Sequence, residues 1–302
     1  MMNVRKNSNL IHQPVSDRIL DVIFYLVMGA LAILCAYPVW YVVAASISDS
    51  AYVNSGALIL LPKGVHFEGY KYILNDNSIW TGYMNTIIYV VGGTIFGLAV
   101  TLPAGYALSR KDLPGRGFFT LYLVFTMYFG GGLIPTYLVV KSLGLVNTRW
   151  VLIIMGSVSV YNMILVRTFF SSNIPEELRE AAFVDGCTNT RFFFQFVLPL
   201  SKAIIAVIGM YLAVGHWNSY YNAMIYTLKK ELHPLQMILR TLLFTEVNMD
   251  TGLDMELLAR QAQIISVIKY AVIVVATLPI MCIYPFLQKY FVQGVMIGSL
   301  KG

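Results

Sequence analysis

Charged residues are scarce in this chain of 302 residues, where they make up 12% of the sequence against 58% for hydrophobic residues. A water-soluble domain of this length does not need so much apolar surface, so a soluble globular fold is excluded. Several apolar runs reach the length that crosses a bilayer, for which about 20 residues suffice. We therefore predict an all-α, polytopic membrane protein, in which the formal net charge of +6 reflects orientation signals and not nucleic-acid binding.

Metal-ligating residues are few and scattered, which argues against a metalloenzyme. No HExxH motif occurs, and no two cysteines have the spacing of a zinc or iron–sulfur site. The residues concerned are His12, His66, His216 and His233, with Cys35, Cys187 and Cys282. We predict no metal site, small buried packing roles for the cysteines, and a packing role for His216.

Two further absences concern the energy source of a membrane transporter. The chain has no Gly-x4-Gly-Lys-Ser/Thr loop, so an ATP-driven pump built on it would take its ATPase from another chain. The centres of the apolar runs also hold no Asp or Glu, because Asp21, Asp49 and Asp112 lie at their ends or beyond. A proton- or sodium-coupled carrier usually keeps such groups, although backbone carbonyls can also bind sodium. A single-chain secondary carrier therefore stays open as an alternative.

Six membrane spans are predicted from the apolar runs, between a cytoplasmic N-terminal tail (1–18) and a C-terminal tail (291–302). The spans cover about 19–45, 80–108, 118–140, 150–170, 204–225 and 264–287 within a transmembrane domain of 19–290. A polar loop at 172–200 separates spans four and five, and a long polar loop at 226–263 separates spans five and six. Span three is interrupted by Gly130–Gly132 and Pro135, which predicts either a hinge or close helix packing, with packing as the default.

The orientation follows from the basic residues of short loops. The link between spans two and three carries Arg110, Lys111 and Arg116, which places it in the cytoplasm. Both termini and the 172–200 loop are then cytoplasmic, and the 226–263 loop is external.

The 172–200 loop carries the signals of a short helix. Pro175 suits a first helical position, where its missing N–H costs nothing, and the two glutamates after it favour the positive end of the helix dipole. Gly186 stands where a helix would end in a left-handed cap. Small apolar groups share one face at i, i+3 and i+4, namely Leu178, Ala181 and Ala182. The loop is therefore predicted to lay a helix across the membrane surface, with acidic edges and a smooth side.

The spacing of this loop resembles that of a known family. Glu180-Ala181-Ala182 is followed after three residues by Gly186, and after nine more by Phe196, one residue and Leu198-Pro199. This pattern is similar to the EAA loop of ABC-importer permeases, which usually have Ile at the position of Phe196. The segments IPTYLVVKSLGLVNTRW, VLPLSK and VGHWNSYYNAMIY extend the resemblance to the carbohydrate-uptake subfamily, the maltose-type group that imports oligosaccharides. The alternative is an ordinary amphipathic connector.

The resemblance implies that the loop helix docks on a cytoplasmic ATPase subunit. The residues implied are Glu177, Glu180, Ala181, Ala182, Asp185, Gly186 and Pro199. In this interpretation Glu180 forms an ion pair with a basic residue of the ATPase, both alanines allow close seating, and Pro199 passes the motion into span five. The C-terminal tail would contact the ATPase subunits as well, through Gly294, Gly298 and Lys301, although a frayed terminus is the alternative.

The resemblance also implies the partners. They are a second, homologous permease, two ATPase subunits that bind ATP and Mg, and an extracellular solute-binding protein that delivers an oligosaccharide. The chain itself is then a non-catalytic subunit of a bacterial cytoplasmic membrane transporter, and it binds no cofactor. An ABC permease for another solute, such as an amino acid or peptide, is the second alternative.

Span five contains the candidates for the substrate path. Aromatic faces pack against sugar rings and amides match hydroxyl groups, which favours Trp217, Asn218, Tyr221 and Asn222. Trp217 and Tyr221 are predicted to share a helix face at i and i+4. An interfacial aromatic belt or helix packing explains the same residues and is not excluded by the sequence.

Overall fold

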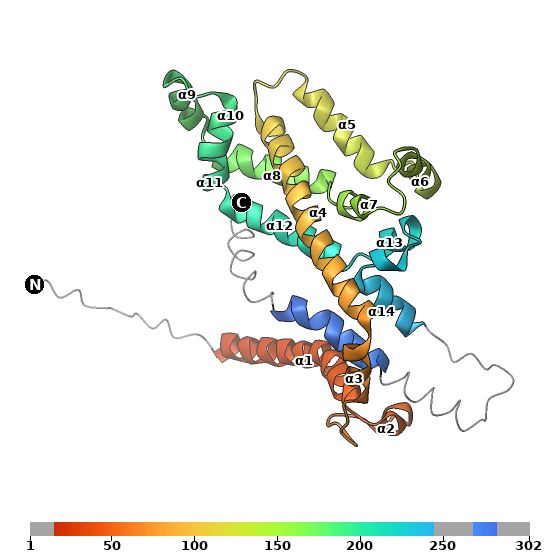
Figure 1. Ribbon diagram of the computed structural model, residues 1–302. Helices are drawn as coiled ribbons and strands as arrows, with labels where there is room; N and C mark the ends of the chain where they lie inside the picture. The colour runs from red at the N-terminus through yellow and green to blue at the C-terminus, as the bar shows by residue number, and fades with distance from the viewer. Residues whose placement is uncertain (1–14, 245–267, 283–302) are drawn as a thin grey trace, which may run out of the picture.

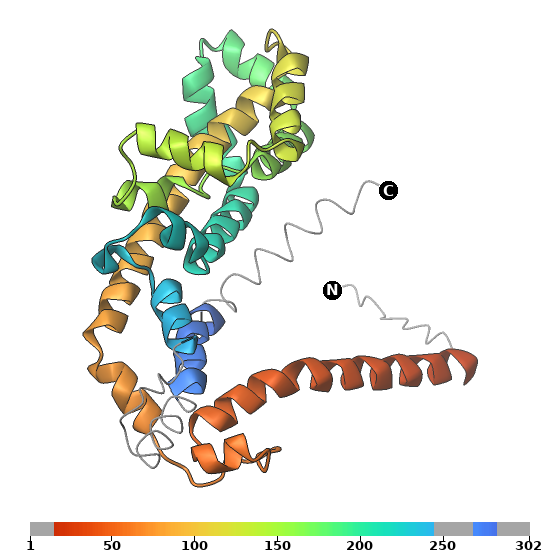
Figure 2. The same ribbon diagram turned by 90° about the vertical axis from the view of Figure 1, so that its right-hand side faces the viewer.

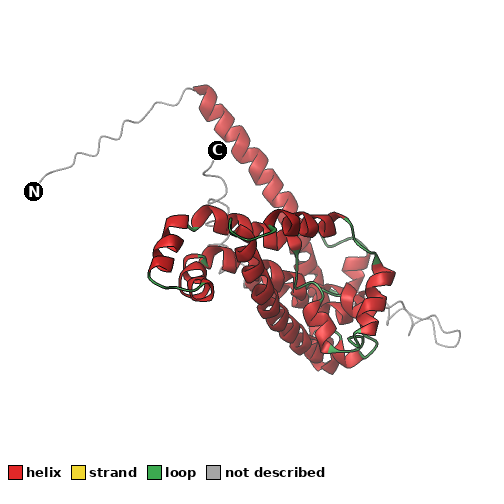
Figure 3. Cartoon of the chain, turned by 90° about the horizontal axis from the view of Figure 1, so that it is seen from above, coloured by secondary structure: helices red, strands yellow, loops and turns green. Residues whose placement is uncertain are grey.

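The structure is a computed structural model that describes residues 15–244 and 268–282. Within these ranges the chain forms helices joined by turns and loops, and no strand is present (Figure 3). The longer helices are α1 (Val15–Ser46), α4 (Asn77–Ser109), α5 (Arg116–Tyr128), α6 (Leu133–Ser142), α8 (Val160–Asn173), α12 (Lys202–Trp217) and one at Ile268–Cys282. The shorter ones are α2 (Ser50–Asn54), α3 (Glu68–Asn75), α7 (Arg149–Ile154), α9 (Glu176–Val184), α10 (Asn189–Phe192), α11 (Leu198–Leu200), α13 (Tyr221–Tyr226) and α14 (Leu235–Leu243). The predicted all-α class is confirmed.

Helix α4 is the axis of the bundle, and α8 and α12 pack along it (Figure 1). Asp76 caps its first turn, because the carboxylate accepts a hydrogen bond of 2.8 Å from the backbone N–H of Ser78. With 33 residues the helix is about 50 Å long, enough to cross a bilayer and both of its interfaces. The described chain is therefore organised around one full-length span.

Glycines in α4 allow this close packing. A Cβ atom on Gly97 would lie 2.6 Å from the backbone carbonyl oxygen of Ser157 and 2.7 Å from Cδ1 of Leu212. A Cβ on Gly93 would collide with the imidazole of His216. Because apolar helices gain no hydrophobic driving force in lipid, small residues that bring backbones together stabilise such contacts.

The contact at Gly97 gives the first prediction. Gly97→Ala is expected to lower the free energy of unfolding by about 2 kcal/mol, because the methyl group meets a backbone carbonyl that cannot rotate away. Thermal unfolding of the purified protein in detergent measures the loss. Gly215→Ala in α12 is the matched control, since no atom of the described residues lies within 4 Å of its Cβ position, and its unfolding temperature should be unchanged or higher. Equal unfolding temperatures for the two variants would contradict the close packing.

Helix α1 leaves the bundle and exposes an apolar surface along most of its length (Figure 2). Its contacts with the rest of the described chain gather at its end, where Ala44 and Ala45 are buried and the ring of Tyr41 meets that of Tyr270 edge-on at 6.2 Å. So much exposed apolar surface requires lipid or another chain around it.

Length and composition identify candidate membrane spans among the described helices. Two described helices, 17–46 in α1 and α4, are long and apolar enough to cross a membrane, and up to four candidates result if each bent pair counts as one span. Only the 268–282 portion of predicted span six lies within the described residues.

Three predicted spans are not continuous: the interruption of span three was expected at its glycines, whereas the breaks in spans four and five correct the sequence interpretation. Span three consists of α5 and α6, bent by 114° at Gly130–Gly132, where Cβ positions meet open space or only Pro135 and no second helix. Within the described residues these glycines border a sharp bend and touch no second helix, which favours the hinge over the default of close packing. Span four is divided into α7 and α8 by residues 155–159, and span five into α12 and α13 by residues 218–220.

Candidate coupling helix and central path

Helix α9 forms in the 172–200 loop as the sequence predicted, but it begins one residue later than expected. Pro175 is the N-cap, with φ −62° and ψ 139°, and the helix begins at Glu176. The prediction had placed Pro175 inside the first turn. The extended ψ explains the difference, because a proline with an extended backbone ends the preceding segment and leaves the first turn to the two glutamates.

The end of α9 matches the prediction for Gly186. Its φ is +76°, and two capping hydrogen bonds close the helix, from the Cys187 N–H to the Ala182 carbonyl (2.9 Å) and from the Gly186 N–H to the Phe183 carbonyl (3.0 Å). This pair of bonds defines a Schellman cap, which requires a left-handed residue and therefore favours glycine. Gly186 acts as the helix stop that lets the chain turn back toward the bundle.

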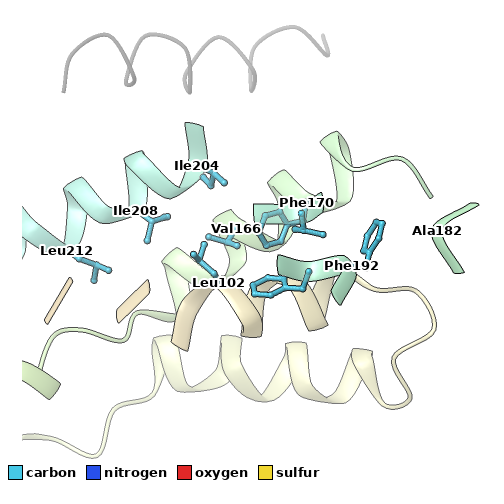
Figure 4. Close-up of a cluster of buried hydrophobic side chains, with 10 residues drawn as sticks. Leu102, Val166, Phe170, Ala182, Phe192, Ile204, Ile208 and Leu212 are labelled. Carbon is cyan, nitrogen blue, oxygen red and sulfur yellow. The ribbon is translucent and has the colours of Figure 1, made fainter. Parts of the chain in front are cut away.

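The two faces of α9 differ sharply. Ala182 is only 8% exposed and packs with Phe170 and Phe192 in a buried cluster between α4, α8, α10 and α12, and Leu178 lies partly buried against it (Figure 4). The opposite face is exposed and consists of Glu177, Glu180, Ala181 and Val184. This corrects the expectation that both alanines face a partner, because Ala182 seats α9 in its own chain.

The charges on the exposed face of α9 are not neutralised within the described chain. Arg179 forms an ion pair with Glu176 at i, i+3, through Nε and Nη2. Glu177 and Glu180 make no ion pair or hydrogen bond with any described residue. Sequence reasoning missed Val184, which is 88% exposed and lies one turn beyond Glu180 and Ala181. The spacing of seven residues between Glu177 and Val184 could have placed the two on one helix face. The face thus combines acidic groups with an exposed apolar side chain.

After α9 the chain returns to the bundle through a rigid aromatic turn. The Thr188 hydroxyl caps α10 by accepting from the Arg191 N–H at 3.3 Å, and a π-helical stretch at Phe193–Val197 follows. Phe196 stacks on Phe192 with ring centroids 5.3 Å apart. Pro199 lies in α11, and the 189–200 helical run meets α12 at an angle of 83°. Phe196, the residue at which the sequence departs from the resemblance, is therefore a ring stacked in this turn.

The basic link 109–116 lies at the same end of the bundle as α9. A cavity of about 420 Å³ is enclosed between that link, the end of α8 and the start of α9. Arg110, Lys111 and Arg116 line it together with Glu176, Glu177 and Arg179. The structure thus places the two segments that the sequence assigned to the cytoplasm side by side, while the assignment of that end to the cytoplasm stays a prediction.

The interruptions of spans four and five meet beside the middle of α4. Ser157, in the first break, lies 3.0 Å from His216 Nε2 through its hydroxyl, and His216 packs on Gly93, the central residue of α4. The Asn222 amide nitrogen, beyond the second break, lies 3.9 Å from the Cβ position of Gly156. Inside a membrane, irregular backbone is tolerated where it is buried in protein or lines a cavity, and transporters place solute sites at such broken helices.

The four residues predicted to line the substrate path differ in their surroundings. Trp217 is 8% exposed, and its indole N–H donates to the Ala276 carbonyl at 3.3 Å, which favours the packing alternative for this residue. Asn218 caps the end of α12 and Tyr221 begins α13, so Trp217 and Tyr221 do not share one helix face as predicted. Asn218 and Tyr221 are exposed and Asn222 is half-buried beside the break. Gly294, Gly298, Lys301 and the 245–263 part of the outer loop lie outside the described residues.

Comparison with known proteins identifies the family. The chain is 38% identical over 286 residues to the polygalacturonan/rhamnogalacturonan transport system permease YtcP of Bacillus subtilis (strain 168), covering 95% of this chain and 99% of that protein. It is 30% identical to the galactooligosaccharides transport system permease GanQ of the same organism, over 92% and 94% of the two chains. No protein-family model matches the chain. The chain belongs to the permease subunits of carbohydrate ABC importers.

A solved structure agrees with this assignment. The permease matches a chain in the crystal structure of a bacterial ABC transporter that imports the acidic polysaccharide alginate, with a TM-score of 0.82 and 33% identity over 92% of this chain and 99% of that one. The permease is therefore a non-catalytic membrane component of a sugar ABC import system. Such systems imply a partner permease, an ATPase and a binding protein.

Proposed function

We propose that this permease takes up an oligosaccharide delivered by an extracellular solute-binding protein, and that two ATPase subunits docked on α9 supply the energy. A second, homologous permease completes the pore. The observation that carries the proposal is the exposed face of α9, where Glu177 and Glu180 have no partner in the described chain. A solvent-facing helix with unpaired carboxylates and the exposed Val184 suits a basic groove with an apolar floor.

The packing of α9 supports its role as a lever. Ala182 seats it beside Phe192 in the buried cluster that also contains Phe170 of α8, so a force on the outer face of α9 is passed to this cluster. The stacked turn at Phe192 and Phe196 leads through Pro199 into α12, whose far end borders the break beside Gly93. ATP-driven closure of the ATPase pair would move α9 together with this turn, and the central breaks would open alternately to the two sides. In this proposal the end that carries α9 is cytoplasmic, as are both termini.

The charge around the α6–α7 and α13–α14 turns supports an acidic oligosaccharide as the solute. The Asn147 side chain accepts from the Leu228 N–H, and the Asn147 N–H donates to the Tyr226 carbonyl, which joins these two segments. The joined segments carry Lys141, Arg149, Lys229 and Lys230 against a single acidic residue, Glu231. A positive field at this end, away from α9, would raise the local concentration of carboxylate-bearing sugars.

Reconstitution of the complete importer tests the function. Proteoliposomes with both permeases, the ATPase subunits and the binding protein should accumulate labelled oligosaccharide only when ATP is present on the side of α9. Uronate-containing and neutral oligosaccharides of equal length should be compared. Uptake by this chain alone, without ATPase or binding protein, would establish the secondary-carrier alternative and overturn the proposal. Uptake of amino acids or peptides in place of sugars would refute the solute class.

The central path gives a second prediction. Tyr221→Ala and Asn222→Ala are each expected to raise the apparent KM for oligosaccharide uptake about tenfold, because a stacking surface or a pair of hydrogen bonds is lost. Initial rates of uptake over a range of sugar concentrations measure the change. Tyr122→Ala is the matched control, since Tyr122 in α5 is 58% exposed against 51% for Tyr221 and lies away from the breaks. An unchanged KM for both variants would remove this region from the solute path.

A further inference from the structure

A groove between α5 and α8 combines two arginines with an apolar wall. It encloses about 500 Å³. Its lining consists of Arg116, Gly117, Thr120, Leu121, Val124 and Arg167, without a carboxylate among them. In an anionic amphiphile, the charged head would match the arginines and the hydrocarbon part would match the apolar wall.

The two arginines of this groove keep donors free for a ligand. Arg167 makes no hydrogen bond or ion pair with any described residue, and Arg116 uses only Nε, which donates to the Leu108 carbonyl at 2.9 Å. Thr120 adds a buried hydroxyl that has no hydrogen-bond partner in the described chain. Guanidinium groups bind phosphate oxygens in pairs, which makes such a site selective for phosphate over a neutral headgroup.

Two neighbouring arginines, Arg110 and Arg179, are already paired with carboxylates, which leaves Arg116 and Arg167 as the arginines available to an anion in this groove. Arg110 is 9% exposed and gives Nε and Nη2 to the two carboxylate oxygens of Asp112, at 2.8 and 2.5 Å. The guanidinium holds the pKa of Asp112 below its usual range, so the pair stays ionised throughout neutral pH. Arg179 is paired with Glu176. Arg116 is the residue shared by the groove and the cavity beside α9.

We propose that the α5–α8 groove binds an anionic phospholipid, with the phosphate between Arg116 and Arg167 and an acyl chain along Leu121 and Val124. Helix α5 has no buried residue and its Leu121 is 70% exposed, so this wall lies open to the surface of the described chain. Basic pockets at the ends of membrane helices are the sites where anionic headgroups are held in preference to zwitterionic ones. This inference goes beyond the transport function and rests on membrane residence, not on ATPase docking.

Native mass spectrometry of the complete detergent-purified importer tests the proposal. Phosphatidylglycerol and phosphatidylcholine with identical acyl chains are titrated separately, and inorganic phosphate is added as a competitor. The wild-type complex should retain phosphatidylglycerol preferentially, and millimolar phosphate should not displace it. The double variant R116Q/R167Q should bind it about thirtyfold more weakly. The control K63Q/K71Q removes the same charge from the opposite end of the bundle and should bind as the wild type does.

Two further variants keep the test decisive if the double variant does not assemble. R116K/R167K keeps the charge and should retain a preference for phosphatidylglycerol, whereas Val124→Trp fills the apolar wall and should weaken binding without changing charge. Displacement by free phosphate, with no effect of Val124→Trp, would show an anion site and not a lipid site. Equal retention of the two lipids, or no lipid on the wild-type complex because the second permease covers the groove, would overturn the proposal.

Discussion

Exchange of Glu180 for lysine is expected to abolish sugar-stimulated ATP turnover in the assembled importer, while the permease still folds and inserts. Glu180 is exposed, has no partner in the described chain and lies at the centre of the outer face of α9. Lysine would place a like charge against the basic group that we propose on the ATPase. A juxtaposition of this kind costs several kcal/mol, and about 3 kcal/mol corresponds to docking that is more than a hundredfold weaker.

ATP hydrolysis by the reconstituted importer, with and without loaded binding protein, measures this effect. Glu68→Lys is the matched control, because Glu68 is also exposed but begins α3 at the other end of the bundle. Its turnover should equal that of the wild type. If the Glu180 variant hydrolysed ATP at the wild-type rate in response to sugar, α9 would not be the docking element and the proposed function would lose its principal support.

The sequence predicted those elements whose signals are local. The Schellman cap at Gly186 needs only a residue that tolerates positive φ, and the first turn of α9 needs only Pro175 followed by acidic residues. Helix α4 could be located because an apolar run of this length has few alternatives to a membrane-spanning helix. In each case the decisive physics acts within a few residues or depends on composition alone.

The breaks in spans four and five could not be located from hydropathy. Residues 155–159 contain no proline, and the exposed Val158 keeps the run apolar. The break depends on Gly156, with φ +89°, and on Ser159, whose hydroxyl caps α8 by accepting from the Asn162 N–H. Both residue types are tolerated inside membrane helices, so their effect depends on the neighbouring α12 and α13. The signal was present, but only tertiary packing makes it decisive.

The sequence also could not predict which side chains of α9 face the rest of the chain. Leu178, Ala181 and Ala182 share an i, i+3, i+4 pattern that does not say whether the face meets a partner or the same chain. In the structure Ala182 is buried in the cluster that contains Phe170 and Phe192, while Ala181 is exposed. A short helix at the edge of a bundle has two candidate neighbours, and periodicity alone cannot choose between them.

These adjacent alanines give the last prediction. Ala182→Asp is expected to lower the free energy of unfolding of the purified permease pair by about 3 kcal/mol, even without ATPase subunits, because it buries a carboxylate among aromatic rings with no partner. Ala181→Asp carries the same helix-propensity cost on the exposed face, adds like charge near Glu177 and Asp185, and should lose only about 1 kcal/mol. Thermal unfolding of the two variants in detergent compares them directly.

The same pair of variants separates folding from docking. Ala181→Asp should unfold closer to the wild-type temperature than Ala182→Asp does and yet weaken ATPase stimulation, because it alters the outer face next to Glu177 and Glu180. Ala182→Asp should lose both stability and stimulation. If Ala182→Asp unfolded at the wild-type temperature and lost only ATPase stimulation, Ala182 would face the ATPase and not the buried cluster around Phe170. The lever would then be held by its partner, and the path of force from α9 through Phe192 to α12 would have to be abandoned.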